Sequence, residues 1–273
     1  MSARPPRVTR TEALVLRHRR LGEADRIVTL LTPARGKVDA VAKGTLRPKS
    51  RLAGHLEPLI QVEVLLAHGR NLDIVTQAQM IEGFPALHAD LERLSTAMYL
   101  AELADRMTVE HAEAHGIYEL LLASLVRLSR GDGVHLVTRT FEMELLATTG
   151  FRPEWRDCIG CGDAVAAERA TWSPLGGGVV CPRCRERHND ALAIDATVLK
   201  VLRAIQAGPY EEAGRIRLNS ELAGGLERVM HTLVRAVSER ALTSAQFVAD
   251  ARRLAAAGVR GDAYTRNDLT EGD

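Results

Sequence analysis

The chain has 273 residues, of which 46% are apolar and 26% are charged, and its formal net charge is +1. This composition excludes disordered and fibrous proteins, and the length is sufficient for roughly two ordinary domains. No apolar run approaches the roughly 18 to 20 residues that span a bilayer, and the basic N-terminus lacks the apolar segment of a signal peptide. We therefore expect a soluble, cytoplasmic protein with no membrane partner.

The near-neutral total conceals a strong segregation of charge. Residues 1–55 contain thirteen Lys and Arg against four acids, a local net charge of +9, so the remaining 218 residues sum to −8. A basic module joined to an acidic body indicates an anionic partner at one end of the protein. The acidic body argues against a protein that coats nucleic acid over its whole surface.

The N-terminal part of the chain has a β pattern after a polar arm of about ten residues. Segments rich in Val, Ile, Leu and Thr, punctuated by Gly and Pro, predict five strands, at Glu12–Leu16, Arg26–Leu31, Gly36–Lys43, Leu59–Leu66 and Leu72–Ile81. Five short strands in so short a segment predict a small closed barrel. The OB-fold is the common barrel of this size, and an SH3-like barrel would give a similar pattern.

The stretch from Gly36 to Arg51 carries five positive charges and one acid. Its first half fits a strand, and Gly44 and Pro48 predict that its second half is a loop. A cationic strand that leads into a cationic loop is typical of a surface for a phosphate backbone, although a solvated loop is the alternative interpretation. Because no Phe, Tyr or Trp precedes Phe84, binding would be mainly electrostatic, with little sequence preference.

After Phe84 the pattern becomes helical. Apolar residues at spacings of three and four predict two helices, over residues 87–103 and 117–128, and a third that ends at Gly150. The same spacing predicts a fourth helix over residues 198–205 and one or two more within 226–247. These apolar stripes predict the core of a helical bundle. The polar residues from Gly258 to the end predict a flexible tail.

All four cysteines occur in two C-x2-C pairs, Cys158 with Cys161 and Cys181 with Cys184, separated by nineteen residues. This spacing predicts one zinc ion held by four thiolates, which fill its tetrahedron and make the site structural. The three glycines at 176–178 predict a hairpin turn that leads into the second pair. Free thiols or redox pairs are the alternatives, and His188 is the residue that could replace a thiolate.

Other potential sites are weaker. His111 and His115 stand four residues apart, but no Glu occupies the position that a zinc protease helix requires, and no third ligand follows. Glu23 and Asp25 have no further acidic motif around them, and a polar loop explains them. No phosphate-binding or nucleophile motif is present, so the sequence makes no positive case for an enzyme.

Several stretches resemble the family of the bacterial DNA repair protein RecO. They are Leu14–Leu16, Leu21–Thr32, Gly36-Lys37, Val41–Gly44, Lys49–Leu52, Leu56–Pro58, Gly69–Leu72, Thr149–Pro153, Ser173-Pro174 and Gly177-Gly178 with Cys181. They follow the family's order and cover nearly the whole chain, to about residue 255.

The resemblance implies a recombination mediator of the RecFOR pathway without catalytic chemistry. Members of this family bind single- and double-stranded DNA and anneal complementary strands. They bind the acidic C-terminal tail of single-stranded DNA-binding protein (SSB) and, with RecR and in some members RecF, help to load RecA onto SSB-coated gaps. Some members lack the zinc cysteines, whereas this chain has all four. Such a protein is expected in the cytoplasm, associated with the nucleoid.

Together these observations predict an α+β chain: an N-terminal five-stranded OB-fold barrel followed by an α-helical bundle with an inserted four-cysteine zinc module. The predicted boundaries are residues 1–82 for the DNA-binding barrel, 83–150 and 191–257 for the two parts of the helical domain, 151–190 for the zinc module and 258–273 for the tail. The expected phosphate contacts are Arg26, Lys37, Lys43, Arg47, Lys49, Arg51 and Arg70.

Two other classes of protein remain open. A zinc-ribbon transcription or RNA-binding protein would contact nucleic acid through Arg183, Arg185 and Arg187 in the cysteine segment. A nuclease would turn DNA over in the presence of a divalent metal.

Overall fold

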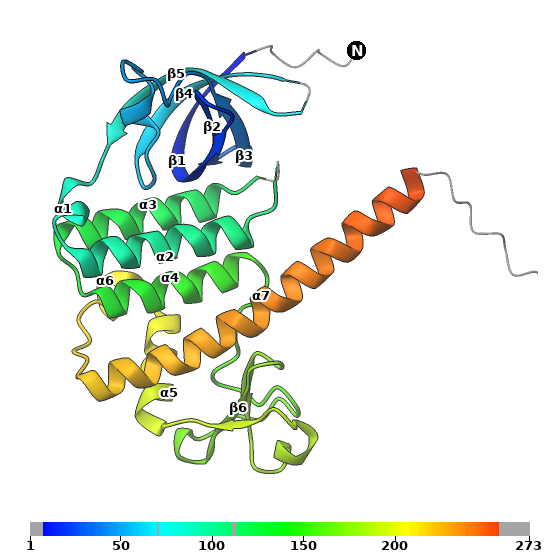
Figure 1. The fold of residues 1–273 in the computed structure, drawn as a ribbon. Helices are drawn as coiled ribbons and strands as arrows, with labels where there is room; N and C mark the ends of the chain where they lie inside the picture. Colours follow the sequence, from blue (N-terminus) through cyan, green and yellow to red (C-terminus); the bar gives the residue numbers. More distant parts are fainter. Residues whose placement is uncertain (1–7, 70, 111–112, 257–273) are drawn as a thin grey trace, which may run out of the picture.

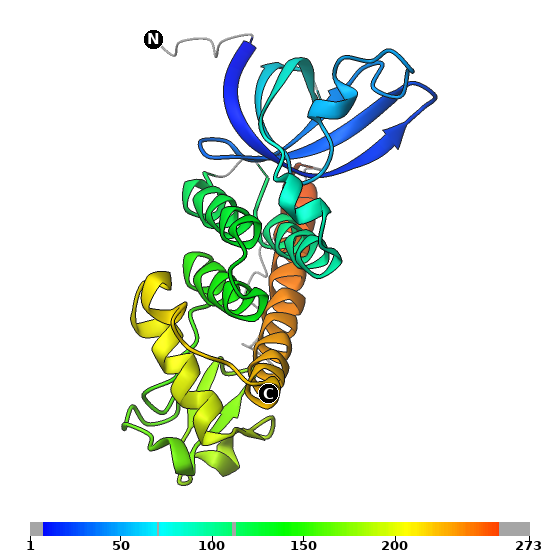
Figure 2. The same cartoon turned by 90° about the vertical axis from the view of Figure 1, so that its left-hand side faces the viewer.

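The computed structural model describes residues 8–69, 71–110 and 113–256, with side chains up to residue 239. A β-barrel, a helical bundle and a small cysteine-bearing segment follow one another along the molecule (Figures 1 and 2). The predicted N-terminal arm lies mostly outside the described residues. Arg70, His111 and the predicted tail at 258–273 also lie outside them.

The barrel consists of β1 (Val8–Leu21), β2 (Asp25–Thr32), β3 (Gly36–Ala42), β4 (Gln61–Ala67) and β5 (Asp73–Glu82). The strands close in the order β1-β2-β3-β5-β4, with β4 paired to β1, and only β3 and β5 run parallel. This is the strand order of an OB-type barrel, so the predicted five-stranded OB-fold is confirmed. A short 3₁₀ helix, η1 (Ala53–His55), lies in the long connection between β3 and β4.

Alternation of side chains explains why these segments are strands. In β3, Val38, Ala40 and Ala42 face the barrel interior, while the residues between them are partly exposed. β1 is longer than predicted because its first half pairs with β4 and its second half, to Leu21, with β2. This second half could not be predicted, since residues 17–20 are polar and form a ribbon that is partly exposed on both faces.

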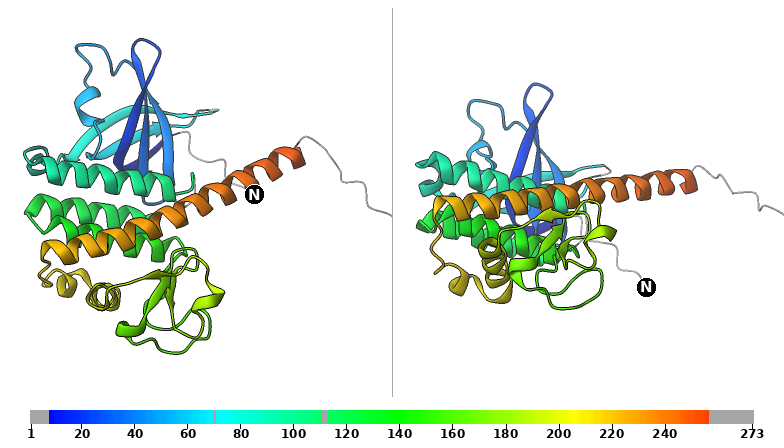
Figure 3. Two further views of the ribbon diagram at one scale, coloured as in Figure 1. Left: turned by 60° about the horizontal axis from the view of Figure 1, so that its bottom comes forward. Right: turned by 90° about the horizontal axis from the view of Figure 1, so that it is seen from below.

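The bundle contains α1 (Pro85–His88), α2 (Leu91–Met107), α3 (His115–Arg130), α4 (Val134–Thr148), α5 (Ala196–Ala207), α6 (Tyr210–Ala213) and α7 (Ser220–Ala256). α2 and α3 lie directly beneath the barrel, with α4 below them (Figure 1). α7 is a single helix of 37 residues that packs on α4 and α5, and its C-terminal part extends beyond the bundle (Figure 3). None of the helices in the described part of the chain combines the length and apolar character needed to cross a lipid bilayer.

The cysteine segment contains a three-stranded sheet in the order β7-β6-β8, from β6 (Thr171–Ser173), β7 (Gly178–Val180) and β8 (Leu192–Ala193). Two 3₁₀ turns, η2 (Ala167–Arg169) and η3 (Arg185–Arg187), flank it. The predicted hairpin turn is present between β6 and β7, with Gly177 at a φ of +73°.

One apolar core joins the bundle to both of its neighbours. Trp155 and Trp172 are buried with ring centroids 6.0 Å apart, in the same cluster as the bundle helices. From the barrel, Leu14, Leu16, Leu31 and Leu59 also belong to this cluster, whereas the rest of the barrel interior forms a separate one. The barrel therefore contributes apolar residues to two cores.

Candidate metal centre and nucleic-acid interface

The four cysteines converge at one point of the small sheet. Cys158 and Cys161 lie in the turn before η2, and Cys181 and Cys184 follow β7 directly. All four Sγ atoms lie within 4.8 Å of one another, and those of Cys161 and Cys181 are 3.8 Å apart. No disulfide joins them, so the group has the geometry to hold a metal ion.

Backbone hydrogen bonds give the two turns the same shape. The Cys161 N–H donates to the Cys158 carbonyl at 3.3 Å, and the Cys184 N–H donates to the Cys181 carbonyl at 3.0 Å. The N–H groups of Gly160 and Cys181 also donate to the Cys158 sulfur, at 3.4 and 3.3 Å. Each turn thus points two sulfurs toward a common centre, and the backbone supplies donors that favour a thiolate at Cys158.

The pKa shifts of the cysteine thiols indicate that a bound cation would stabilise the cluster. Burial opposes ionisation of Cys158, but its backbone N–H donors outweigh burial and lower the pKa of this thiol to about 6. Burial and the neighbouring sulfurs raise the pKa of Cys184 to about 12. The protein alone therefore favours a thiolate at one position and opposes it at another. A divalent ion that prefers sulfur would offset this repulsion, so the donor set fits such an ion.

Close approach of the two turns requires glycine at position 160. A Cβ at Gly160 would lie 3.0 Å from the Cβ and 3.1 Å from the Sγ of Cys184. The same Cβ would lie 3.4 Å from His188 Nε2, so His188 stands beside the cluster but outside the group of four ligand atoms. Within residues 8–69, 71–110 and 113–239, no other group of three His, Cys, Asp or Glu could share an ion.

The connection after β3 presents exposed cations on a fixed backbone. Lys43, Arg47, Lys49 and Arg51 are exposed. We refer to these four residues as the cationic loop. The Asp25 carboxylate accepts a hydrogen bond from the Gly44 N–H at 2.7 Å, and the Leu46 N–H donates to the Ala24 carbonyl at 2.9 Å. None of the ion pairs among the described residues involves these four side chains, so their charges are available to an anion.

The other predicted phosphate contacts differ from the cationic loop. Arg26 is only 18% exposed and pairs with Glu57, with 2.7 Å between NH1 and Oε1. Lys37 is 14% exposed, and its Nζ donates to the backbone carbonyl of Asp105 in α2 at 2.6 Å. Of the seven predicted phosphate contacts, the four of the cationic loop are therefore free of ion pairs, whereas Arg26 and Lys37 are paired with acidic residues. Arg70 lies outside the described residues.

Sequence reasoning missed Arg20, which lies near this surface. β1 and β2 pair Arg20 with Arg26, and β2 and β3 pair Arg26 with Ala42, the residue before Lys43. Arg20 is exposed and takes part in no ion pair of the described chain. The only available signal was the run of Arg and His at 17–20, which has no meaning until the length of β1 is known.

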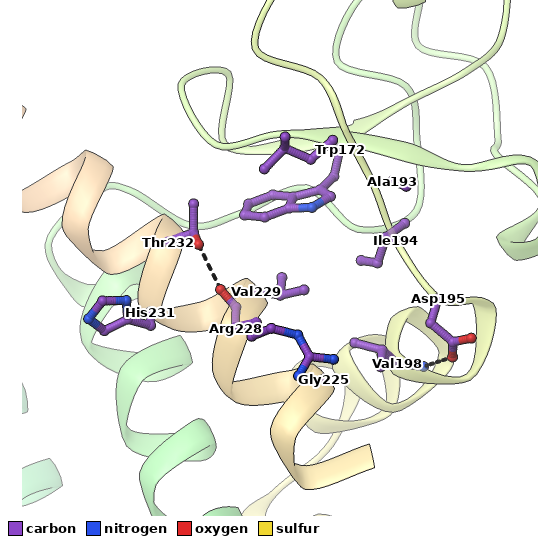
Figure 4. Close-up of a pocket in the computed structure, with 11 residues that line it drawn as sticks. Trp172, Ala193, Ile194, Asp195, Val198, Gly225, Arg228, Val229, His231 and Thr232 are labelled. Atoms are coloured by element: carbon purple, nitrogen blue, oxygen red, sulfur yellow. Dashed lines mark hydrogen bonds between the residues drawn. The ribbon is translucent and has the colours of Figure 1, made fainter. Parts of the chain in front are cut away.

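A groove lies between the cysteine segment and α7 (Figure 4). It encloses about 410 Å³, and Trp172, Ile194, Val198 and Val229 give it an apolar lining. Arg228 also lines the groove; it is exposed and forms no salt bridge in the described part of the protein. The groove thus combines an apolar floor with the free positive charge of Arg228 and the carboxylate of Asp195, which accepts hydrogen bonds from the N–H groups of Thr197 and Val198 at the start of α5.

Two family models match the barrel and the rest of the chain, and the relatives named below match most of the chain at once. Residues 7–84 match the family described as "Recombination protein O N terminal", and residues 88–246 match "Recombination protein O C terminal". "DNA repair protein RecO" of Roseiflexus sp. (strain RS-1) is 38% identical over 248 residues, which cover 91% of this chain and 87% of that protein. The protein of the same name from Desulforudis audaxviator (strain MP104C) is 40% identical over 238 residues, covering 87% of this chain and 95% of that protein.

Proposed function

Because this chain belongs to the recombination protein O family, we propose that it acts in DNA repair as a mediator of homologous recombination. In this role it binds single- and double-stranded DNA, anneals complementary strands and, with RecR, helps to load RecA on SSB-coated DNA. RecR and the SSB tail are its direct protein partners, RecF joins as in some members of the family, and RecA is engaged indirectly. The protein acts by binding, without a catalytic step, at the nucleoid in the cytoplasm.

We propose a separate role for each of the predicted domains. Residues 1–82 bind DNA, 83–150 and 191–257 form the helical domain, and 151–190 form the zinc module.

The cationic loop is the observation that supports DNA binding most directly. Its four free cations stand on an OB-type barrel, a fold that holds single-stranded nucleic acid in many proteins. Lys and Arg side chains that neutralise phosphates release counterions, and the same charges screen the repulsion between two strands. Annealing follows if one cationic surface holds both strands close together.

A titration of salt tests the role of the loop. With four phosphates neutralised, the logarithm of the affinity for single strands should fall with the logarithm of salt with a slope of about −3. Lys43→Glu combined with Arg47→Glu should reduce the slope by at least about 1.4. The matched control is Arg185→Glu with Arg187→Glu in η3, which should leave it unchanged. If the change in η3 reduced the slope and the change in the cationic loop did not, the protein would instead bind nucleic acid through its cysteine segment, as a zinc-ribbon protein does.

The annealing role has its own test. Two complementary DNA strands are coated with the cognate SSB and mixed with the protein, without nucleotide. We expect faster annealing, and loss of the acceleration when the acidic tail of SSB is deleted. If the protein binds bare DNA but does not accelerate annealing, the mediator role fails. Cleavage of DNA in the presence of a divalent metal would instead support a nuclease.

We propose that Cys158, Cys161, Cys181 and Cys184 bind one structural Zn²⁺ per chain. Zinc would neutralise the crowded sulfurs and hold the two cysteine turns together; in small zinc peptides such binding is worth of order 10 kcal/mol. Protein purified without chelator should contain one zinc per chain, and Cys181→Ser should lose it. Absence of the metal from the natural chain would contradict the assignment.

The groove of Figure 4 is our proposed site for the SSB tail. The tail is acidic, and Arg228 is a free cation beside apolar residues, where a charge-assisted contact is worth about 1.5–3 kcal/mol. Arg228→Glu should therefore weaken binding of a tail peptide at least roughly tenfold. Arg235→Glu is the matched control, because Arg235 lies on the same helix and already pairs with Glu239. Equal effects of the two changes would move the tail site elsewhere.

A further inference from the structure

The second half of β1 carries four basic side chains in a row, at positions 17–20, and three of them have an acidic partner. The three pairs are Arg17 with Asp105 of α2 at 2.6 Å, His18 with Glu57 of the β3–β4 connection at 3.0 Å, and Arg19 with Asp39 of β3 at 3.8 Å. Arg20 is exposed and forms no ion pair within the described residues. Three different elements therefore supply acids to this strand, and Arg20 is left without one.

Arg20 and Arg19 lie on opposite faces of the sheet, because successive side chains of a strand alternate. The register places Arg20 opposite Arg26 of β2, and Arg26 opposite Ala42 of β3. Residues that lie opposite one another in neighbouring strands share a face, so Arg20 is on the face of Ala42, which is buried in the barrel interior. Arg19 is on the outer face with its partner Asp39.

The connection that carries the cationic loop reaches the face of Arg20. Glu57, at the far end of this connection, lies 3.0 Å from His18 Nε2 and accepts a hydrogen bond from Arg26 NH1 at 2.7 Å. His18 precedes Arg20 by two residues and Arg26 is directly opposite it, so both flank Arg20 on the same face. Glu57 is thus engaged by two neighbours of Arg20, and the cationic loop begins where β3 ends beside them.

Two acids follow Arg20 closely in the sequence, and neither pairs with it. Asp25 is opposite Leu21, so its side chain is on the other face, and its Oδ1 accepts the hydrogen bond from the Gly44 N–H. Glu23 is exposed in the turn between β1 and β2 and forms no ion pair within the described residues. Arg20 therefore resembles the four members of the cationic loop, whose charges are likewise available to an anion.

We infer that Arg20 is a fifth phosphate contact of the barrel, and that a DNA strand held by the cationic loop crosses the ends of β3, β2 and β1 to reach it. The inference rests on the proposed function in taking DNA as the ligand and the cationic loop as its first contact. β3 and β1 are two strand spacings apart, about 9.5 Å, which a few nucleotides span. DNA then uses one face of the β1 extension, because acids neutralise Arg17 and Arg19.

The test is a salt titration of binding to a fluorescein-labelled oligodeoxythymidine, followed by fluorescence anisotropy. With five phosphates neutralised, the slope of log affinity against log salt should be about −3.5. Arg20→Gln should make the slope less steep by about 0.7 and weaken binding several-fold, because one phosphate contact is lost. Arg20→Lys keeps the charge and should keep the slope.

The matched control is Arg19→Gln, which removes the same charge from the neighbouring position on the opposite face and should leave the slope unchanged. An unchanged slope in Arg20→Gln would overturn the inference, and so would equal losses in Arg20→Gln and Arg19→Gln. The variant with Lys43→Glu and Arg47→Glu, measured in the same series, reports on the proposed function. If it reduces the slope and Arg20→Gln does not, the inference fails and the proposed function stands. If Arg20→Gln alone reduces the slope, the loop assignment fails instead.

Discussion

At the scale of the residue, Gly160 fixes how closely the two cysteine turns approach. An added Cβ would lie 3.0 Å from Cys184 Cβ, which is tighter than ordinary van der Waals contact. The second turn would have to move, and with it two of the four sulfurs. The geometry of the metal site therefore depends on a residue that is not itself a ligand.

Gly160→Ala should weaken zinc binding and lower the free energy of unfolding by roughly 1 to 3 kcal/mol, the usual cost of overpacking. Competition with a chromogenic chelator measures the first effect, and urea unfolding measures the second. Gly54→Ala is the control, since a Cβ there meets no atom within 4 Å. Equal stability and zinc affinity in the two variants would contradict the steric argument.

Asp73 lies where β5 pairs with β3, the parallel contact of the barrel. β3 and β5 share only two residue pairs, one of which is Ala40 with Asp73. Burial alone would raise the pKa of Asp73, but Arg35, 2.7 Å away, and His68 outweigh burial and lower it below its ordinary value. A carboxyl whose pKa is lower in the folded state stabilises the protein above the unfolded pKa, near 4, and loses that effect in acid.

Asp73→Asn should therefore lower the free energy of unfolding at pH 7 by roughly 1 to 3 kcal/mol. The difference from the natural chain should begin to shrink as the pH falls below about 4, the pKa of an unfolded Asp, and should be lost once the pH has passed below the lower pKa of folded Asp73. Urea unfolding of both proteins at pH 7 and at a pH below about 4 measures this difference. Glu63→Gln provides the control, because the pair of Glu63 with Arg10 is exposed and should contribute less than about 1 kcal/mol. A difference that stays constant with pH would exclude the ionic explanation.

At the scale of the element, α7 contains two adjacent glycines with different surroundings. A Cβ at Gly225 would lie 2.6 Å from Val198 Cγ2 in α5, whereas one at Gly224 would meet only the Arg228 guanidinium, at 3.4 Å. Gly225 thus permits close packing of the two helices, while Gly224 has no such role. This contact also forms one end of the groove that we assign to the SSB tail.

Gly225→Ala should destabilise the protein, because the roughly 1 kcal/mol gained from helix propensity is smaller than the cost of a clash with a branched side chain. Gly224→Ala should stabilise it by up to about 1 kcal/mol. Thermal unfolding of the two variants measures both effects. Shifts of the same sign would refute the packing argument.

Elements with a clear periodicity could be predicted from the sequence. The inward residues of β3, the apolar stripes of the helices and the spacing of the cysteines all depend on neighbours close in sequence. Periodicity could not predict which Lys and Arg side chains form ion pairs and which are left without one. Lys37 meets its partner 68 residues later, and Arg26 meets Glu57 31 residues later. Pairs so distant in sequence leave no periodic signal.

At the scale of the whole molecule, the barrel and the bundle are not independent. Leu14, Leu16, Leu31 and Leu59 leave the barrel interior and join the core of the bundle. Hydrogen bonds add to this contact, since the Tyr118 hydroxyl donates to Glu12 at 3.2 Å. Separation of the two parts would expose an apolar patch on the barrel.

A fragment of residues 1–84 should therefore bind a hydrophobic dye such as anilinonaphthalene sulfonate and self-associate, whereas the full chain should do neither. Dye fluorescence and size-exclusion chromatography give the comparison. Replacing Leu16 and Leu31 of the fragment by Thr, which also favours strands, should reduce both effects. A monomeric fragment that binds no dye would show that the barrel is self-sufficient.

Because β1 pairs with β4, the first strand must wait for its partner during synthesis. Thr9 in β1 meets its partner His68 only 59 residues later in the chain. At translation rates of about 5 to 20 residues per second, the first strand emerges roughly 3 to 12 seconds before its partner strand β4. Its outer leucines remain uncovered for longer still, until the helices have left the ribosome. The nascent N-terminal strand therefore exposes these apolar residues for several seconds during synthesis.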